Sequence, residues 1–223
     1  MRIPRIVIAG ATSGVGKTSI TCSIIYCLQK HGFSVQPFKV GPDYIDPGYL
    51  SSISKHETYN LDVWLMGKNQ LLNSFISNSQ SDVSVIEGVM GYYDGFGGDS
   101  NHASTHHVAS LTKSPVLLVL DASKTSRSIA ATALGFVKFH KNSHISGIIL
   151  NKIGSKKHEI LCRTALEKIK IPIIGVIPKN PLLDMPSRHL GLISTLENKT
   201  LKTQVQKVSK IISNYLDIGE IIK

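Results

Sequence analysis

The sequence has few cysteines and no long apolar run, and each absence excludes a class of protein. Its 223 residues include three cysteines, Cys22, Cys27 and Cys162, which form neither a CxxC pair nor a zinc-ligand spacing with histidine. We therefore expect buried, reduced thiols. Apolar runs such as Val116–Leu120 are far shorter than the roughly 18 residues that span a bilayer, and no long hydrophobic signal region follows Met1. These absences predict a cytoplasmic protein without a membrane partner.

Arginine-rich runs with interleaved aromatic residues are also missing, although the net charge is +10. Residues 1–100 carry 7 Lys and Arg against 8 Asp and Glu, whereas residues 101–223 carry 18 against 7. The positive electrostatic field of such a segment favours nucleic acid, an anionic membrane surface or a small polyanionic substrate as a partner. The simplest explanation of the charge excess is a basic face exposed to solvent. Because the lysines are scattered singly, we do not expect nucleic acid as a partner.

Short apolar runs alternate with stretches of helical periodicity along the chain. Alternating strands and helices of this kind form a mainly parallel sheet covered on both faces. The sequence therefore predicts an α/β fold with three α/β/α layers, and because no repeat or linker divides the chain, we expect one domain over residues 1–223. The expected strands are Arg5–Ala9, Val35–Val40, Val83–Ile86, Val116–Leu120, Ile145–Leu150 and Ile173–Ile177.

The C-terminal segment shows the pattern of an amphipathic helix. From Leu201 onward, apolar residues recur at helical spacing. We expect this helix to pack on the sheet or on a partner. Its apolar stripe consists of Val205, Val208, Ile211, Ile212 and Tyr215.

A glycine-rich loop, Gly10–Thr18 (GATSGVGKT), lies between the first expected strand and a helix over Ser19–Lys30. This is the context of the phosphate loop of P-loop NTPases: backbone N–H groups cradle phosphate oxygens, Lys17 neutralises their charge and the Thr18 hydroxyl can bind Mg²⁺. The strict spacing places glycine at position 11, where this chain has Ala11, a variant that several P-loop subfamilies tolerate. The alternative is a chance glycine-rich turn. The expected nucleotide-binding residues are Gly14, Val15, Gly16, Lys17, Thr18 and Ser19.

A second nucleotide-binding motif is expected at Asn151-Lys152-Ile153-Gly154, at the end of a strand. Nucleotide-binding folds often place a base-reading Asn-Lys pair there, but Gly154 replaces the Asp of the guanine-specific pattern. We therefore expect ATP rather than GTP, with Asn151 at the base. In the alternative interpretation, Asn151 only caps a turn.

Acidic residues follow two other expected strands, and loops after parallel strands share one edge of the sheet. Lys39, Asp43 and Asp46 follow the second strand and are expected at the γ-phosphate and its Mg²⁺, although an exposed turn is the alternative. Glu87 directly follows an apolar strand, as a Mg²⁺ ligand would. Asp94 lies seven residues further on and either faces a substrate or stabilises its own loop. The histidines near His106 lack acidic or cysteine ligands in the next turn and do not favour a metal site.

With these motifs in this order, the sequence resembles the N-terminal, ATP-binding domain of cobyrinic acid a,c-diamide synthases, relatives of dethiobiotin synthetase. The GPDYIDP and EGVMG segments are specific to this family and to the related nickel-sirohydrochlorin a,c-diamide synthases. The matching stretches are Pro4–Thr18, Val35–Pro47, Asn60–Asp62, Glu87–Gly91, Tyr93–Gly95, Asp121–Ser123, Ile149–Asn151 and Arg188–Leu192.

The resemblance implies an ATP-dependent carbon–nitrogen ligase of cobalamin biosynthesis, which amidates the a- and c-acetate groups of a tetrapyrrole polycarboxylate through an acyl phosphate. It implies that Lys17, Thr18, Lys39 and Glu87 hold ATP and Mg²⁺. It further implies that Asp43 and Asp46 organise the metal or the reacting carboxylate, and that Tyr44 and Asp94 face the tetrapyrrole. Lys39, Asp43, Asp46, Glu87 and Asp94 are thus the expected catalytic residues, and Thr18, Asp43 and Glu87 the expected metal ligands.

The sequence departs from the family at Leu50, where the family usually has His, and at Lys55–Thr58, so the tetrapyrrole, its metal and the order of amidation stay open. The family's C-terminal glutamine amidotransferase domain is not expected in this chain, because none of its cysteines lies in a nucleophile elbow. Ammonia is then expected from a glutaminase domain or subunit outside this chain, and the resemblance favours a homodimer. The competing hypothesis is a ParA/MinD-like regulatory P-loop ATPase, although residues 10–15 lack the usual second lysine.

Overall fold

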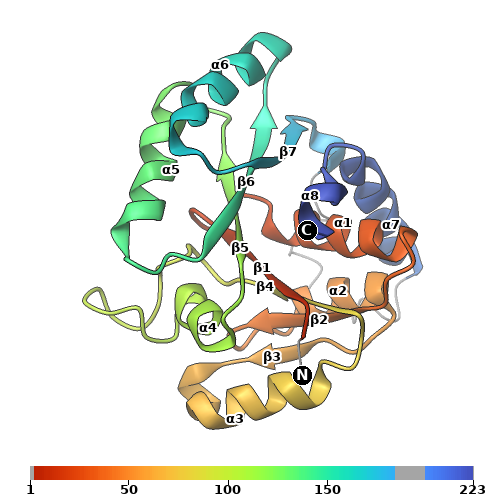
Figure 1. Cartoon of the computed structure of the whole chain (residues 1–223). Coiled ribbons are helices and arrows are strands. Elements are labelled where there is room, and N and C mark those ends of the chain that lie inside the picture. Colours follow the sequence, from red (N-terminus) through yellow and green to blue (C-terminus); the bar gives the residue numbers. More distant parts are fainter. Residues whose placement is uncertain (1–2, 184–198, 223) are drawn as a thin grey trace.

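The fold is a seven-stranded parallel sheet between two layers of helices (Figure 1). The structure, a computed structural model, describes residues 3–183 and 199–222, so the expected match at Arg188–Leu192 lies outside the described residues. The strands are β1 (Arg5–Gly10), β2 (Val35–Val40), β3 (Tyr59–Leu61), β4 (Val83–Glu87), β5 (Val116–Asp121), β6 (Ile145–Ile153) and β7 (Ile173–Pro178). The helices are α1 (Lys17–Lys30), α2 (Asp46–Ser54), α3 (Val63–Asn78), α4 (Thr105–Thr112), α5 (Ser128–Phe139), α6 (Lys156–Leu166), α7 (Lys199–Ser213) and α8 (Ile218–Ile222).

The strand order is β3-β2-β4-β1-β5-β6-β7, and neighbouring strands of this sheet pair in parallel. The predicted α/β class and all six predicted strands are confirmed. The seventh strand, β3, was missed because a three-residue edge strand with Asn60 at its centre has no apolar run to reveal it.

Both faces of the sheet are buried, which explains the continuous apolar runs of the strands. Along β5, Val116, Leu118 and Leu120 pack in one core, whereas Leu117 and Val119 pack in the other. The first core is covered by α3, α4, α5 and α6, and the second by α1, α2 and α7 (Figure 1). The period of two along each strand therefore assigns alternate side chains to the two helical layers.

The cysteines and the C-terminal helix can now be placed. The three cysteines are free and buried, as predicted. Helix α7 confirms the predicted amphipathic helix and buries Val205, Val208 and Ile212 in the core with α1 and α2. Tyr215 is not on this helix, however: its carbonyl accepts a hydrogen bond from the N–H of Val176 at 3.2 Å, because the chain turns after α7 to pair with the β7 edge. Among the described helices, none has the length and apolar character needed to cross a membrane.

We expect Ile212→Ala to destabilise the protein by about 2–5 kcal/mol, because it removes buried methyl groups and leaves a cavity between α7 and the sheet. The same substitution at the exposed Ile222 is the matched control and should change the free energy of unfolding by less than about 0.5 kcal/mol. Urea denaturation measures both. Equal effects at the two positions would contradict the packing of α7 described above.

Candidate functional site

The candidate site lies at the carboxyl edge of the sheet, where β1, β4 and β2 are neighbours. The parallel register pairs Ile8 with Glu87 and Glu87 with Lys39, so the sheet itself places these two charged residues side by side. The loops that follow the three strands, residues 11–16, 41–45 and 88–104, all leave from this edge. Ligands of open α/β sheets bind in such a place.

The phosphate loop joins β1 to α1 with two close backbone approaches that require glycine. A Cβ at Gly10 would lie 2.7 Å from Val15 Cγ2, and one at Gly16 would lie 2.5 Å from Asn151 Nδ2. Gly16 also has φ of 92° and is the N-cap of α1, whose first turn holds no acidic side chain. The N–H groups at this helix start therefore face no competing carboxylate from the first turn, as anion binding requires.

Lys17 and Thr18, at the start of α1, contact the loop and strand beside them. Lys17 Nζ donates to the Met90 carbonyl at 2.7 Å and lies 3.5 Å from the Thr12 carbonyl. The Thr18 hydroxyl donates to Glu87 Oε1 at 2.8 Å. Lys17 thereby joins the start of α1 to the loop after β4, and Thr18 joins it to the end of β4 itself.

Lys39 is the centre of a buried cluster of charges. Its side chain is 2% exposed, and its Nζ lies 2.6 Å from Asp46 Oδ2, 2.9 Å from Glu87 Oε1 and 3.5 Å from Asp43 Oδ2. The structure thus brings together Lys39, Asp43, Asp46 and Glu87, from β2, the following loop, the start of α2 and the end of β4. Three carboxylates around one ammonium group leave a negative excess that a bound cation would offset.

Burial and charge act against each other on these groups. Burial by itself would lower the pKa of Lys39, but the carboxylates of Glu87 and Asp46 outweigh it and hold the pKa above its ordinary value. Burial raises the pKa of Glu87, and the Lys39 ammonium opposes that rise. For Asp43, burial is outweighed by Lys39 and by the N–H groups of Ile45 and Asp46, so its pKa is lowered. Lys39 is therefore charged at neutral pH, and its ammonium group favours the ionised forms of Glu87 and Asp43.

The donor set at Glu87 fits a magnesium ion. Its Oε2 atom is buried and has no hydrogen-bond partner among the described residues, while Oε1 accepts from Thr18 and Lys39. Within the described part of the chain, no group of three or more His, Cys, Asp or Glu side chains is arranged to hold a metal alone. Mg²⁺ needs no such group, because one or two protein oxygens together with phosphate and water complete its shell.

Asn151 lies on the other side of the phosphate loop, at the end of β6. Its Nδ2 donates to the Val15 carbonyl at 2.8 Å, and Lys152 Nζ bridges Asp121 Oδ2 at 2.8 Å and the Gly14 carbonyl at 3.3 Å. Asn151 therefore fastens the phosphate loop, beyond capping its own turn through Oδ1. It also lines a cavity of about 310 Å³ whose other lining residues include Gly16, Ser19, Ser123, Lys152, Lys179 and Pro181.

The structure keeps the two expected substrate residues out of the Lys39 cluster. Tyr44 projects from the loop beyond Asp43 and is 89% exposed. Asp94 Oδ2 accepts the Gly91 N–H at 2.8 Å, which is the loop-stabilising alternative that the sequence left open. Asp94 also lines a hollow with Phe136 and Phe139 of α5, away from β2. In the contacts among the described residues, Asp94 does not reach the charged cluster.

Sequence reasoning missed the bridge between Asp121 and Lys152. Asp121 was noted only as part of a family match, and Lys152 only as part of a base-reading pair. The signal was available, because Asp121 ends β5 and is in register with Asn151 at the end of β6. An acid at the end of an apolar strand, next to a strand ending in Asn-Lys, predicts this pairing.

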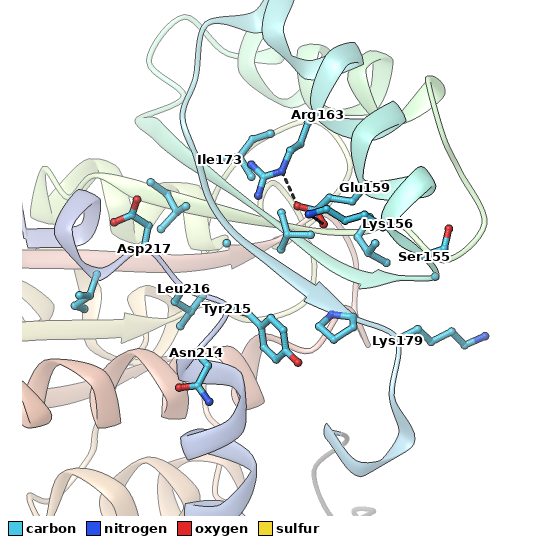
Figure 2. A pocket seen from close by; sticks show the side chains of 17 residues that line it. Ser155, Lys156, Glu159, Arg163, Ile173, Lys179, Asn214, Tyr215, Leu216 and Asp217 are labelled. Carbon is cyan, nitrogen blue, oxygen red and sulfur yellow. Dashed lines mark hydrogen bonds and ion pairs between the residues drawn. The ribbon is translucent and has the colours of Figure 1, made fainter.

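A larger cavity of about 850 Å³ lies beside β7 and holds none of the predicted site residues. Figure 2 shows Lys156, Glu159 and Arg163 of α6 on one side of it and the Asn214–Asp217 segment on the other. Arg163 Nε pairs with Glu159 Oε1 at 2.8 Å. The charged cluster and the phosphate loop, rather than this cavity, define the candidate site.

Comparisons with known proteins identify the family of the chain. A family model described as the CobQ/CobB/MinD/ParA nucleotide binding domain matches residues 6–193. A cobyrinate a,c-diamide synthase of Listeria innocua is 41% identical over 98% of this chain and 49% of its own length. One of Dehalococcoides mccartyi is 40% identical over 100% and 49%, and a hydrogenobyrinate a,c-diamide synthase of Streptomyces coelicolor is 44% identical over 87% and 40%. The chain spans about half the length of the curated relatives it matches, and the family resemblance is confirmed.

Among solved structures, chloroplast FtsY from Physcomitrella patens superposes with a TM-score of 0.58, covering 79% of this chain and 59% of its own. The signal recognition particle receptor FtsY from Elizabethkingia anophelis, in complex with GDP, superposes with a TM-score of 0.57 over 79% and 57%. At 17% and 15% identity, these likenesses show the fold alone.

We expect Lys39→Met to destabilise the protein by about 3–5 kcal/mol, because it leaves buried carboxylates without their counter-charge. Adding Glu87→Gln should recover part of this loss by removing one unpaired charge, whereas the two changes would simply add if the residues were independent. Urea denaturation of the four proteins of this cycle gives the coupling. A Lys39→Met protein as stable as the parent would contradict the cluster.

The lowered pKa of Asp43 predicts an acid-dependent contribution to stability. A carboxyl group whose folded pKa lies below its ordinary value of 3.8 stabilises the fold above that value and loses this contribution as the pH falls through the lowered pKa. The free energy of unfolding of the parent should therefore fall more steeply below about pH 4 than that of Asp43→Asn. Parallel pH profiles of the two proteins would show that Asp43 is not held by Lys39 in solution.

Proposed function

The chain belongs to the CobQ/CobB/MinD/ParA nucleotide-binding domain family, and we propose that it is the ATP-dependent part of an amide-forming ligase of cobalamin biosynthesis. Its substrate in this proposal is a corrin polycarboxylate such as cobyrinate, amidated at the a- and c-acetate groups. The observation that carries the proposal is the identity of about 40% to cobyrinate a,c-diamide synthases over the whole chain. The charged cluster beside a phosphate loop is consistent with it.

The chemistry requires activation of a carboxylate. A carboxylate is a poor electrophile, so one of its oxygens attacks the γ-phosphorus of ATP, ADP leaves, and an acyl phosphate forms. Ammonia then attacks the acyl carbon, and the C–O bond to phosphate breaks to give the amide and inorganic phosphate. Both steps depend mainly on positioning and on stabilising negative charge.

The residues of the site match these requirements. Lys17 and the N–H groups of the phosphate loop would hold the β- and γ-phosphates, and Lys39 would offset charge where the substrate carboxylate approaches. Glu87, Thr18 and Asp43 would hold Mg²⁺, which when bound neutralises phosphate charge. Asp46 fixes Lys39 through the 2.6 Å contact. These roles explain why so many charges are buried together at one strand edge.

The cavity lined by Asn151 is the proposed site of the adenine base. It opens beside Gly16 and Ser19, at the start of α1, and so lies next to where a nucleotide's phosphates would bind. Gly154 provides no carboxylate to read guanine, and its N–H instead donates to His158 Nδ1 at 3.1 Å. We therefore propose ATP as the nucleotide.

A regulatory ATPase is the second candidate, because the same family model also describes MinD and ParA proteins. Such a protein would hydrolyse ATP without transferring phosphate to a carboxylate. The identity to diamide synthases over nearly the full chain favours the ligase. Nickel-sirohydrochlorin is the alternative tetrapyrrole, and ammonia would come from a glutaminase domain or subunit.

The test is mass spectrometry of reactions with ATP, Mg²⁺ and ammonium chloride, with cobyrinic acid or nickel-sirohydrochlorin as substrate. We expect two successive exchanges of a carboxyl OH for NH₂ on one of these substrates. With substrate labelled by ¹⁸O in its carboxylates, one label per amide should appear in inorganic phosphate, because the acyl phosphate transfers that oxygen.

Lys17→Ala is the control variant and should abolish amidation by weakening the hold on phosphate. ATP binding by the parent without amidation of either substrate would contradict the free-ammonia ligase. ATP hydrolysis with no ¹⁸O in phosphate would favour the regulatory ATPase.

A further inference from the structure

Large apolar side chains are exposed at the carboxyl edge of β2, β3 and β4, in the half of the site that carries Lys39. They come from the loops after β2 and β4 and from the first turn of α3, which follows β3. Soluble proteins rarely leave such a group in water unless it binds something. The residues are Tyr44, Ile45, Trp64, Leu65, Met90 and Phe96.

Trp64 and Phe96 form the centre of this group. Their rings stack with centroids 4.3 Å apart and an interplanar angle of 29°, yet the side chains remain 57% and 60% exposed. They come from different segments, the first turn of α3 and the loop between β4 and α4, which lie at the left of Figure 1. A stacked pair with so much exposed ring surface can stack with a further flat ring, and we call Trp64 and Phe96 together the aromatic platform.

The backbone holds both rings in place. Asp62 Oδ1 accepts the N–H groups of Trp64 at 2.8 Å and Leu65 at 3.2 Å, which fixes the start of α3. Phe96 N–H donates to the His102 carbonyl at 2.8 Å and closes its loop. At Gly95, a Cβ would lie only 2.2 Å from that carbonyl, so the closure requires glycine. The platform is therefore built into the backbone before any ligand binds.

Basic side chains border the aromatic pair. The His102 ring meets Trp64 edge-on with centroids 6.0 Å apart, and His107 lies 5.3 Å from His102. Burial lowers the pKa of His107, and the nearby His102 and Lys68 lower it further. Asp99 is the one acid in the 95–103 loop. A ligand suited to this border carries negative charge at its rim.

The platform adjoins the charged cluster. Lys39 is in register with Asn60 of β3, and Asn60 Nδ2 donates to the Asp43 carbonyl at 2.9 Å. Asp62, which fixes Trp64, follows β3 directly. A ligand that rests on the platform therefore has its edge next to the loop of Asp43 and Tyr44.

We propose that the Trp64–Phe96 stack binds one face of the macrocycle of a tetrapyrrole polycarboxylate through the outer face of one of its rings, with the other ring supporting it from behind, while His102 and Lys68 contact carboxylates at the ligand's rim. This inference rests on the proposed function and adds the subsite that recognises the ring system. The flat stacked surface, the basic border and the continuity with the reaction centre favour this ligand over a second protein chain. Tyr44 borders the same ligand from the loop after β2.

The test measures binding separately from activity. Equilibrium dialysis of the full chain uses two probes: cobyrinic acid, and uroporphyrin as a planar tetrapyrrole polycarboxylate that is not the proposed substrate. Trp64→Ala and Phe96→Ala should each weaken binding of both probes about 10-fold, because one substitution removes the ring that contacts the ligand and the other removes the ring that supports it; aromatic stacking contributes about 1–3 kcal/mol, and 1.4 kcal/mol is tenfold. Trp64→Phe should retain most of the affinity. Phe139→Ala, at an exposed ring on α5 outside the platform, is the control and should have no effect.

Further readouts identify the role. ATP affinity should stay unchanged in all variants, and in the amidation assay Trp64→Ala should raise KM for cobyrinic acid far more than it lowers kcat. Lys68→Gln should weaken binding at low salt and much less at high salt. Circular dichroism melting checks that the variants are folded.

The outcomes separate the platform from the proposed function. Normal amidation and unchanged probe binding in Trp64→Ala and Phe96→Ala would overturn the platform and leave the ligase standing. Probe binding that depends on Trp64, without amidation by the parent, would support the platform and overturn the ligase. Failure of the parent to bind either probe would overturn the platform, as would a Trp64→Ala variant that changes only the oligomeric state in sedimentation.

Discussion

The site depends on one buried interaction, the ammonium group of Lys39 between the carboxylates of Asp46 and Glu87. It joins β2, β4 and the start of α2, and Glu87 in turn accepts the Thr18 hydroxyl at the start of α1. Such a cluster adds little net stability, because desolvating each ion costs several kcal/mol and the attraction between the opposite charges only partly offsets this cost. Its presence at the carboxyl edge of the sheet fits the proposed function, in which fixed charges lie where phosphate charge develops.

Much of this arrangement could be predicted from sequence, because charged residues at the ends of apolar strands must lie at an edge of the sheet. Lys39 and Glu87 lie at the carboxyl ends of two strands and the phosphate loop follows a third, and a parallel sheet brings these ends to one edge. The strand order, which decides whether those ends are neighbours, could not be deduced from periodicity. The family resemblance made the grouping plausible, and the register of β2 with β4 shows it.

The parts that sequence could not predict are those made by contacts between distant segments. The stacking of Trp64 on Phe96 joins residues whose separation follows no helical or strand period, so no local pattern indicates it. Strand β3 is too short to leave an apolar signature. The position of Asp94 in a glycine-rich loop could be predicted, but the direction of its side chain could not. That direction depends on the conformation of the loop, in which Asp94 Oδ2 accepts a hydrogen bond from the Gly91 N–H.

The strand order also divides the proposed reaction between two halves of one edge. β1 and its phosphate loop lie in the middle; β5 and β6 on one side carry Asp121 and Asn151 beside the cavity proposed for the base. On the other side, β4 and β2 carry Glu87 and Lys39, and Trp64 follows β3. In the proposed function, a nucleotide with its base beside Asn151 and its phosphates on the central loop would direct its outermost phosphate toward the Lys39 half. A carboxylate approaching from the aromatic platform would meet that phosphate from the side opposite the departing ADP, which is the alignment that an in-line transfer needs.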